Sequence, residues 1–345
     1  MTAPGLAAAV VRWQRRHGRR DLPWQGTRDP YRVWLSEVML QQTQVATVLE
    51  YYPRFLARFP DLAALAAAPL DDVLALWSGL GYYSRARHLH RCAQVVVAEQ
   101  GGRFPATRAG LQALPGIGRS TAAAIAAFCF GQREAILDGN VKRVLTRALG
   151  FEGDLASAAE EQRLWALAES LLPSRDVDVY TQGLMDLGAT VCRARRPDCE
   201  RCPLAASCAA RAAGTPERFP VKSRRLRRGR REAALLWLRR GGRLWMVQRP
   251  ERGVWAGLWS LPEFDSVATL EQAVDGWPGQ GEWLAPVAHA LTHFDWTLHP
   301  LAWRLPARTP LPAAAGPGRW FTPAQALALG LPAPVRRLIE SGGMA

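Results

Sequence analysis

The chain has 345 residues, of which 48% are apolar, and its formal net charge is +14 with a pI near 10.5. That length accommodates two domains with real cores, and the apolar content excludes a disordered chain. The excess of basic residues predicts a polyanionic partner, and nucleic acid is the favoured one. An Arg-rich proteome would also give such an excess. The early apolar run, residues 6–11, is too short for an export signal, and no stretch reaches membrane-spanning length, so we expect a cytosolic protein.

The first predicted elements are a basic aromatic segment and an amphipathic helix. Residues 12–24 end in Arg-Arg-Asp-Leu-Pro-Trp, which by itself indicates only a surface arm with a buried tryptophan. Asp29 followed by Pro30 is a typical helix start, and apolar residues keep helical spacing from Tyr31 to Val45.

Polar residues form a stripe on that predicted helix at Glu37, Gln41 and Gln44. A carboxylate that adjoins an apolar face is costly to ionise, so its pKa should rise, as a general acid at neutral pH requires. A glutamate at the rim of a core face is the commoner explanation for such a position.

A second predicted helix, residues 69–78, leads into a segment rich in glycine, tyrosine and arginine. This segment, residues 79–87, reads Gly-Leu-Gly-Tyr-Tyr-Ser-Arg-Ala-Arg. Such a loop suits close approach to DNA, with an aromatic wedge near the bases and charges on phosphates. An equally simple interpretation is that the tyrosines close the core.

The centre of the chain predicts a helical hairpin. Helical spacing fits residues 107–114 and 120–130, and the Pro-Gly-Ile-Gly between them, residues 115–118, cannot continue a helix. The two helices should therefore fold back on each other. An ordinary helix connection would show the same pattern.

The residues of the turn point to DNA binding. Gly116 and Gly118 expose peptide N–H groups at the start of a helix, where they form a site for a phosphate oxygen. Leu114 and Ile117 are expected to anchor the hairpin in the core, while Arg119 adds positive charge outside.

An acidic turn follows in residues 136–144, Ile-Leu-Asp-Gly-Asn-Val-Lys-Arg-Val. It places Asp138 at the end of an apolar run, just before a basic helix. Asp138 or Asn140 could simply cap that helix, since both residue types suit the task. Beside a DNA-binding hairpin, the carboxylate is also a candidate for catalysis.

Four of the six cysteines form one closely spaced set. The set is Cys192-x6-Cys199-x2-Cys202-x5-Cys208. Cys92 and Cys129 lie on alanine-rich helical stretches and are expected to be buried thiols. Four thiolates at this spacing in a cytosolic protein are expected to bind metal rather than form disulfides. Ligand type alone leaves zinc open.

The composition then changes twice. Residues 214–231 are rich in Arg, Pro and Gly without apolar periodicity, which predicts a linker that could also lie along phosphates. Strand-like stretches at 233–238 and 243–247 flank an Arg-Arg-Gly-Gly turn, residues 289–303 form another extended run, and residues 333–341 predict a helix. The expected domains are 1–213, helical, and 232–345, α+β.

The hairpin, the acidic turn, the Glu37 segment and the cysteine set together resemble the helix-hairpin-helix DNA glycosylases, in particular the MutY-type adenine DNA glycosylases. The likeness is strong over about residues 10–210 and looser beyond. Residues 36–45, Ser-Glu-Val-Met-Leu-Gln-Gln-Thr-Gln-Val, are similar to the family signature, and residues 253–259, Gly-Val-Trp-Ala-Gly-Leu-Trp, resemble its Nudix-like domain.

This resemblance implies a fold class. It is a mainly α N-terminal glycosylase domain, with the hairpin at 111–130 and an iron–sulfur cluster loop at 192–208, joined to an α+β Nudix-like C-terminal domain. The implied cofactor is a [4Fe–4S] cluster held by the four cysteines, with Pro203 directly after the third and a set of arginines around the loop to meet the DNA backbone. The glutamate-rich Nudix hydrolase box is missing from the sequence, which implies recognition without pyrophosphate chemistry.

The resemblance also implies roles for single residues. Glu37 protonates adenine, Asp138 stabilises the sugar cation, and Asn140 positions the sugar, the phosphate or water. The residues implied to line the pocket of the extruded base are Arg20, Leu22 and Trp24. Gln182, in the helical stretch 180–185, is a candidate base-pocket residue that reads the adenine edge, although an exposed helical glutamine is the simpler interpretation. Those implied to wedge into the stack or to read 8-oxoguanine are Gln42, Leu80, Tyr82, Thr292 and His293, with Leu291 in place of the family's aromatic. The phosphate-binding hairpin residues are Gly116, Ile117, Gly118 and Arg119.

One position separates the close relatives. Sister enzymes that also cut the strand, such as the endonuclease III types, carry a Schiff-base lysine where this chain has Ser120. The implied activity is removal of adenine opposite 8-oxoguanine or guanine, without efficient strand cleavage. Lys142, one helical turn after Asp138, would complicate a borohydride test. The implied partner is double-stranded DNA, with abasic-site processing enzymes downstream, no membrane, a monomeric state and a cytoplasmic, nucleoid-associated location.

Two other functions fit part of the sequence. A thymine-glycol or abasic-site glycosylase/lyase is disfavoured by Ser120 and by the second domain. A non-catalytic DNA-binding iron–sulfur protein would keep the hairpin and the cluster, but it leaves the pairing of Glu37 with Asp138 unexplained.

Overall fold

The computed structural model describes residues 3–223 and 228–342. Contacts divide the chain into two compact units, residues 1–66 with 91–225, and residues 67–90 with 226–345. The first unit is helical and the second is built on a mixed sheet, so the predicted fold class is confirmed. Residues 67–90 join the second unit, although the sequence placed them in the helical domain. None of the helices in the described ranges is long and apolar enough to cross a membrane.

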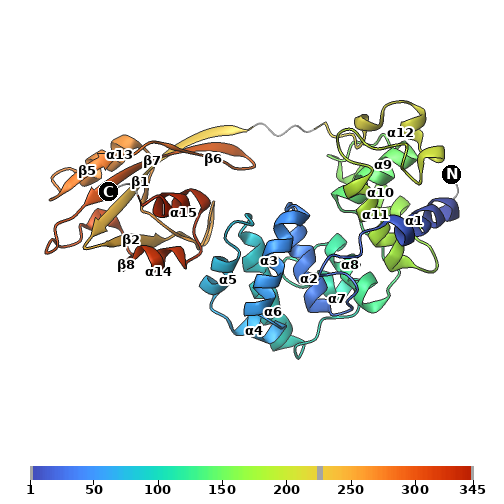
Figure 1. Cartoon of the computed structure of the whole chain (residues 1–345), viewed down its shortest axis with the longest axis horizontal. Coiled ribbons are helices and arrows are strands. Elements are labelled where there is room, and N and C mark those ends of the chain that lie inside the picture. The colour runs from blue at the N-terminus through green and yellow to red at the C-terminus, as the bar shows by residue number, and fades with distance from the viewer. Residues whose placement is uncertain (1–2, 224–227, 343–345) are drawn as a thin grey trace. The chain divides into compact units, whose positions relative to one another are not determined.

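Short helices build the first unit (Figure 1). Those that lie in it wholly or in part are α1 (Ala3–His17), α2 (Pro30–Leu40), α3 (Val45–Arg58), α4 (Leu62–Ala67), α6 (Ser84–Glu99), α7 (Arg108–Gln112), α8 (Arg119–Phe130), α9 (Gly139–Leu149), α10 (Ala158–Ser170), α11 (Val177–Thr190) and α12 (Ala209–Ala212). The apolar faces of α1, α8, α9, α10 and α11 share one buried core. Gly188 allows α11 to approach α9, because a Cβ there would lie 2.6 Å from the Cβ of Asn140.

The predicted helix from Tyr31 to Val45 is two helices, which corrects the sequence analysis. Asp29 caps α2 as expected, its side chain accepting from the Tyr31 N–H at 2.9 Å, but α2 ends at Leu40. Four consecutive polar residues, 41–44, offer nothing to bury, and the chain turns there with a φ of 56° at Gln42. The polar stripe of Glu37, Gln41 and Gln44 therefore does not exist as a helical face.

The described residues of the second unit contain an eight-stranded sheet, with the order β3-β2-β1-β7-β5 along its main path. Its elements are β1 (Gly229–Arg240), β2 (Arg243–Gln248), β3 (Trp259–Ser260), β4 (Glu263–Phe264), β5 (Gln280–Trp283), β6 (Val287–Ala290), β7 (Phe294–Arg304), β8 (Arg319–Phe321), α5 (Leu70–Leu76), α13 (Val267–Val274), α14 (Pro323–Leu327) and α15 (Ala333–Glu340). The long strands β1 and β7 are parallel neighbours, and α13 covers one face through Leu270 and Val274.

The strands agree with the predicted positions except at one turn. The Arg-Arg-Gly-Gly turn joins β1 to β2, with positive φ at both glycines, and the predicted tail helix is α15. The extended run 289–303 is instead the antiparallel hairpin of β6 and β7, closed by a hydrogen bond from Leu291 N–H to Phe294 O at 2.9 Å. Thr292 and His293 form the exposed tip of this hairpin.

The predicted linker contacts the helical unit over its first half. Leu155 N–H donates to Val221 O at 3.1 Å, and Asp154 accepts from the backbone and hydroxyl of Ser223. Phe219 is buried. Residues 224–227 of the linker lie outside the described residues, and β1 begins at Gly229.

Candidate active site

Asp138 lies where a buried extended segment meets the start of α9. It is the N-cap of that helix: its Oδ1 accepts from Val141 N–H at 2.7 Å, and Oδ2 accepts from the Asn140 amide at 3.3 Å. Burial raises the pKa of Asp138 above its ordinary value, while the bonds from Val141 and Asn140 oppose that rise. Asp138 therefore caps α9, as the simpler interpretation of the sequence predicted. The cap places a carboxylate at the positive end of the helix dipole.

Glu37 faces the same site from α2. Burial raises the pKa of Glu37 from 4.5 to about 8, and the negative charge of Asp138 adds to the rise. The second effect requires the two carboxyl groups to be close, although 101 positions separate them in the sequence. The environments differ: burial and the charge of Asp138 both raise the pKa of Glu37, whereas Asp138 keeps hydrogen bonds that favour its charge. Glu37 therefore keeps its proton more readily than Asp138 does.

Ser120 supports the acidic turn. Its hydroxyl accepts from Leu137 N–H at 3.1 Å, directly before Asp138. Lys142 pairs with Glu161 of α10. Asn140 is fixed from its other side, because Arg143 donates to Asn140 Oδ1 at 2.7 Å and to Cys192 O at 2.7 Å.

The predicted pocket segment is anchored to α11. Leu22 and Trp24 are buried and Trp24 packs edge-on against Tyr52 at 5.4 Å, whereas Arg20 is exposed. The side chain of Gln182 does not project freely into solvent, because its amide nitrogen donates to Asp186 Oδ1 at 2.9 Å.

Sequence reasoning missed two residues here. Asp186 is fully buried and gathers hydrogen bonds from α1, from the segment after it and from α11. Gln25, directly after Trp24, has both amide atoms buried without a hydrogen-bond partner, which leaves donor and acceptor capacity for a ligand. An acidic residue four positions after Gln182 on one helix was the only available signal for Asp186.

The hairpin has the expected form. Gly116 takes a φ of 74°, which favours glycine, and Leu114 and Ile117 are buried as predicted. A Cβ on Gly118 would meet open space, so the helix start is accessible from outside. Arg119 lies over Trp165 at 3.9 Å and donates to Glu169 at 2.6 Å, so its charge is already partly neutralised.

The four cysteines of the set come together in one loop. Each is partly buried, and the charges of Cys192 and Cys208 add to the burial that raises the pKa of the Cys199 thiol. Burial raises the pKa of Cys202 to about 11, with the same neighbours contributing. Within the described part of the chain, no three His, Cys, Asp or Glu side chains have the arrangement of a formed metal site. The donor set of four neighbouring thiols nevertheless fits a cluster or a zinc ion.

Arg147 organises this loop. The side chain is 2% exposed, and its guanidinium donates to Arg193 O at 2.7 Å, Ala194 O at 3.0 Å and Phe219 O at 3.3 Å, and contacts Cys192 Sγ at 3.4 Å. A set of arginines is exposed around the loop: Arg193, Arg195, Arg196 and Arg201. The loop therefore presents positive charge outward while a buried arginine fixes its backbone.

In the second unit, the two wedge candidates differ in exposure. Leu80 is 5% exposed and belongs to the core, whereas Tyr82 is 44% exposed and has a φ of 48°. The Tyr82 hydroxyl shares a hydrogen bond of 2.9 Å with Thr292 at the β6–β7 tip. Gln42, in the first unit, is exposed at its own turn.

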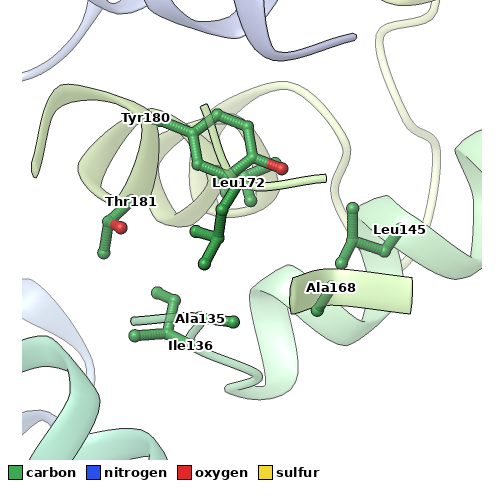
Figure 2. Close-up of a pocket in the computed structure, with 8 residues that line it drawn as sticks. Ala135, Ile136, Leu145, Ala168, Leu172, Tyr180 and Thr181 are labelled. Carbon is green, nitrogen blue, oxygen red and sulfur yellow. The ribbon is translucent and has the colours of Figure 1, made fainter. Parts of the chain in front are cut away.

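A small hollow lies in the helical core beside the acidic turn (Figure 2). Ala135 and Ile136 line it on one side, with Leu172 and Tyr180 opposite. The Tyr180 hydroxyl is buried without a partner, and burial raises the pKa of Tyr180 well above its usual range. The apolar lining marks it as a packing gap rather than a base pocket.

Comparisons with known proteins identify families and solved structures that are similar to this chain. The family model for HhH-GPD superfamily base excision DNA repair proteins matches residues 35–170, and the NUDIX domain model matches residues 233–341. The structure of a thermostable thymine-DNA glycosylase is similar with a TM-score of 0.55 and 30% identity over 61% of this chain and 97% of that one. An endonuclease III–DNA complex, at 21% identity and a TM-score of 0.53, covers 62% of this chain and 98% of that one, and supports the fold alone.

The fold and the site therefore define a helix-hairpin-helix base excision repair glycosylase with a Nudix-like second domain. The adenine DNA glycosylase of Buchnera aphidicola (strain APS) is 34% identical over 99% of this chain and 98% of its own length. The human adenine DNA glycosylase is 37% identical over 88% of this chain and 68% of its own. The chain belongs to the adenine DNA glycosylase family.

Proposed function

We propose that this glycosylase removes adenine paired with 8-oxoguanine, and also adenine paired with guanine, without efficient strand cleavage. The observation that supports the proposal is the electrostatically coupled pair of carboxyl groups, Glu37 with a pKa of about 8 and the hydrogen-bonded Asp138. When their environments keep one carboxyl group protonated and the other ionised, the two can take different roles. The first acts as the acid and the second stabilises positive charge, as in glycoside hydrolysis.

Glu37 acts as the general acid. It transfers its proton to the extruded adenine, at N7, and the C1′–N9 bond then breaks with its electron pair leaving on the base. The neutral purine is a far better leaving group than the anion. Asn140, Leu22 and Trp24 hold the sugar and the base in place, with the aromatic ring suited to a base outside the stack.

Asp138 acts on the sugar. Its ionised carboxylate stabilises the oxocarbenium-like cation, either through charge alone or through a transient bond to C1′, until water adds. The Val141 N–H and the Asn140 amide keep one carboxylate charge in place for this task. Ser120 holds the segment before Asp138 and offers no amine for a Schiff base, and Lys142 is engaged by Glu161. Base release without strand scission follows.

The remaining parts bind DNA. The Gly116–Arg119 turn takes a phosphate, Gln42 and Tyr82 enter the stack, and Thr292 and His293 donate hydrogen bonds to the lesion. The helical unit carries the chemistry, and the sheet unit, which includes residues 67–90, recognises the opposite strand. Buried Leu80 serves as support for Tyr82 rather than as a wedge.

Cys192, Cys199, Cys202 and Cys208 would hold a [4Fe–4S] cluster. Such a cluster supplies a rigid cross-link among its ligands and no step of base release. Arg147 and the exposed arginines of the same loop then present a fixed basic surface to the DNA backbone.

The test uses labelled duplexes that contain adenine opposite 8-oxoguanine, adenine opposite guanine, or thymine glycol, each with and without hot alkali. Cleavage of the first two duplexes only after alkali is the expected result. Products before alkali, or products from thymine glycol, would favour a bifunctional glycosylase/lyase. No product from any duplex would reduce the protein to a DNA-binding role.

A further inference from the structure

Trp255 has a backbone conformation that is rare for a bulky residue. Its φ is 56°, in the left-handed region that favours glycine. The glycines on either side, Gly253 and Gly257, also take positive φ, but the position between them carries the largest side chain of all. Such strain persists only where surrounding contacts hold the residue, and it concentrates at functional sites. The contacts of Trp255 therefore indicate what its position achieves.

The buried ring of Trp255 bridges the two strands of the β6–β7 hairpin. It stacks on Trp296 of β7, with ring centroids 4.8 Å apart and 14° between the planes, and its centroid lies 5.4 Å from that of His289 in β6. His289 and Trp296 are direct partners across the hairpin. Each lies three positions from the exposed tip, His289 before Thr292 and Trp296 after His293. One ring therefore supports both strands just below the tip.

The loop that carries Trp255 is itself fixed. Arg249 Nε donates to Val254 O at 3.0 Å, and the same guanidinium pairs with Glu263 at 2.5 Å. Both partners of this ion pair are largely shielded from solvent, which strengthens it. The guanidinium carbon also lies 5.7 Å from the centre of the Trp255 ring. These contacts hold the loop, and with it the ring, against the strain of the backbone.

The hairpin is packed on one face near its tip. Phe294 of β7, at the edge of the tip, packs edge-on against Trp296 with ring centroids 5.5 Å apart. The opposite face of the hairpin is exposed at Ala288, Ala290 and Asp295. The position of the tip therefore depends on the rings of the packed face.

We propose that Trp255 is a positioning residue that holds the β6–β7 tip and thereby sets the preference for adenine opposite 8-oxoguanine over adenine opposite guanine. The inference rests on the proposed function, in which Thr292 and His293 donate hydrogen bonds to the lesion. The O8 atom of 8-oxoguanine accepts such a bond, and guanine has no oxygen at that position. Because hydrogen bonds weaken steeply with distance and misalignment, a displaced tip loses this difference. Release of adenine opposite guanine does not use the bond and should change little.

The test measures kcat/KM for release of adenine opposite 8-oxoguanine and opposite guanine, by the full-length protein and its variants. Trp255→Gly removes the ring and relieves the strain, since glycine adopts positive φ freely. The ratio of the two kcat/KM values should fall by roughly tenfold. Trp255→Phe keeps a flat ring over Trp296 and should restore most of the ratio. Trp283→Ala is the matched control, because it removes an exposed tryptophan from β5 of the same sheet, and it should leave the ratio unchanged.

A second background separates positioning from general loosening. If Trp255 acts through the tip, W255G should lower the ratio no further in a protein that already carries Thr292→Ala and His293→Ala. An equal further fall in that background, or an equal fall of both kcat/KM values in W255G alone, would overturn the proposal. Trp255→Leu keeps most of the apolar volume and takes over the test if W255G does not fold, and an unchanged ratio in W255L would also overturn it. Absence of adenine release by the unaltered protein would instead refute the proposed function.

Discussion

The rate of adenine release should fall about tenfold for each pH unit above the pKa of Glu37. Burial, and then the charge of Asp138, raise that pKa from 4.5 to about 8. At pH 7 a carboxyl with a pKa of about 8 is about nine-tenths protonated, whereas one with its ordinary pKa is protonated to only about 0.3%. The environment of Glu37 thus supplies about 300-fold more of the acid form at neutral pH. On the acid side, the rate should fall as Asp138, whose pKa burial also raises, takes up a proton.

The assay is single-turnover excision from an adenine:8-oxoguanine duplex between about pH 5 and about pH 9.5. Glu37→Gln should lower the rate by roughly 10²- to 10⁴-fold and abolish the alkaline decline, because an amide donates no proton. Glu50→Gln, at an exposed glutamate of α3, is the matched control and should retain the wild-type profile. A wild-type rate that stays level between about pH 7 and about pH 9.5, or a fully active E37Q, would refute the reasoning.

Three further outcomes are expected. Because the folded-state pKa of Glu37 is raised, its contribution to stability is fully present below 4.5 and is lost as the pH rises through about 8. E37Q should therefore unfold at a higher temperature than wild type at high pH and at the same temperature at low pH, by calorimetry; identical curves throughout would contradict this. Ser120→Ala should cost about 1–3 kcal/mol by leaving the buried Leu137 N–H unpaired, and Ser120→Thr should restore most of it in a urea melt. Cys199→Ser should lose the brown colour and the iron, about four per chain in wild type, whereas Cys129→Ser should keep both; zinc in colourless wild-type protein would exclude the cluster.

Much of this protein could be predicted from short stretches of its sequence. The fold class, the hairpin with buried Leu114 and Ile117, and the helix start at Asp29 are all confirmed. Each depends on local geometry: glycine at a φ of 74° in Gly116, a cap residue before proline, and apolar spacing along one helix. Such features need no distant contact, so the sequence suffices for them.

The sequence did not predict the extended run 289–303 or the polar stripe correctly, because both depend on tertiary contacts. Helical spacing predicted that one helix continues through residues 41–44. In the structure α2 ends at Leu40, because none of these four residues is buried. The run 289–303 has continuous strand propensity, and only its pairing with itself reveals the turn that exposes Thr292 and His293. Residues 67–90 join the second unit through tertiary bonds such as Tyr83 OH to Leu331 O at 2.8 Å.

The sequence by itself determined the residue types that chemistry requires: two acids, a serine in place of a lysine, and four thiols at close spacing. Tertiary structure alone decided their electrostatic states. Glu37 acquires its raised pKa from burial and from a carboxylate 101 residues away, and Asp186 acquires its importance from Arg19, 167 residues away. Desolvation and charge coupling act through space, so no pattern along the chain could have supplied them.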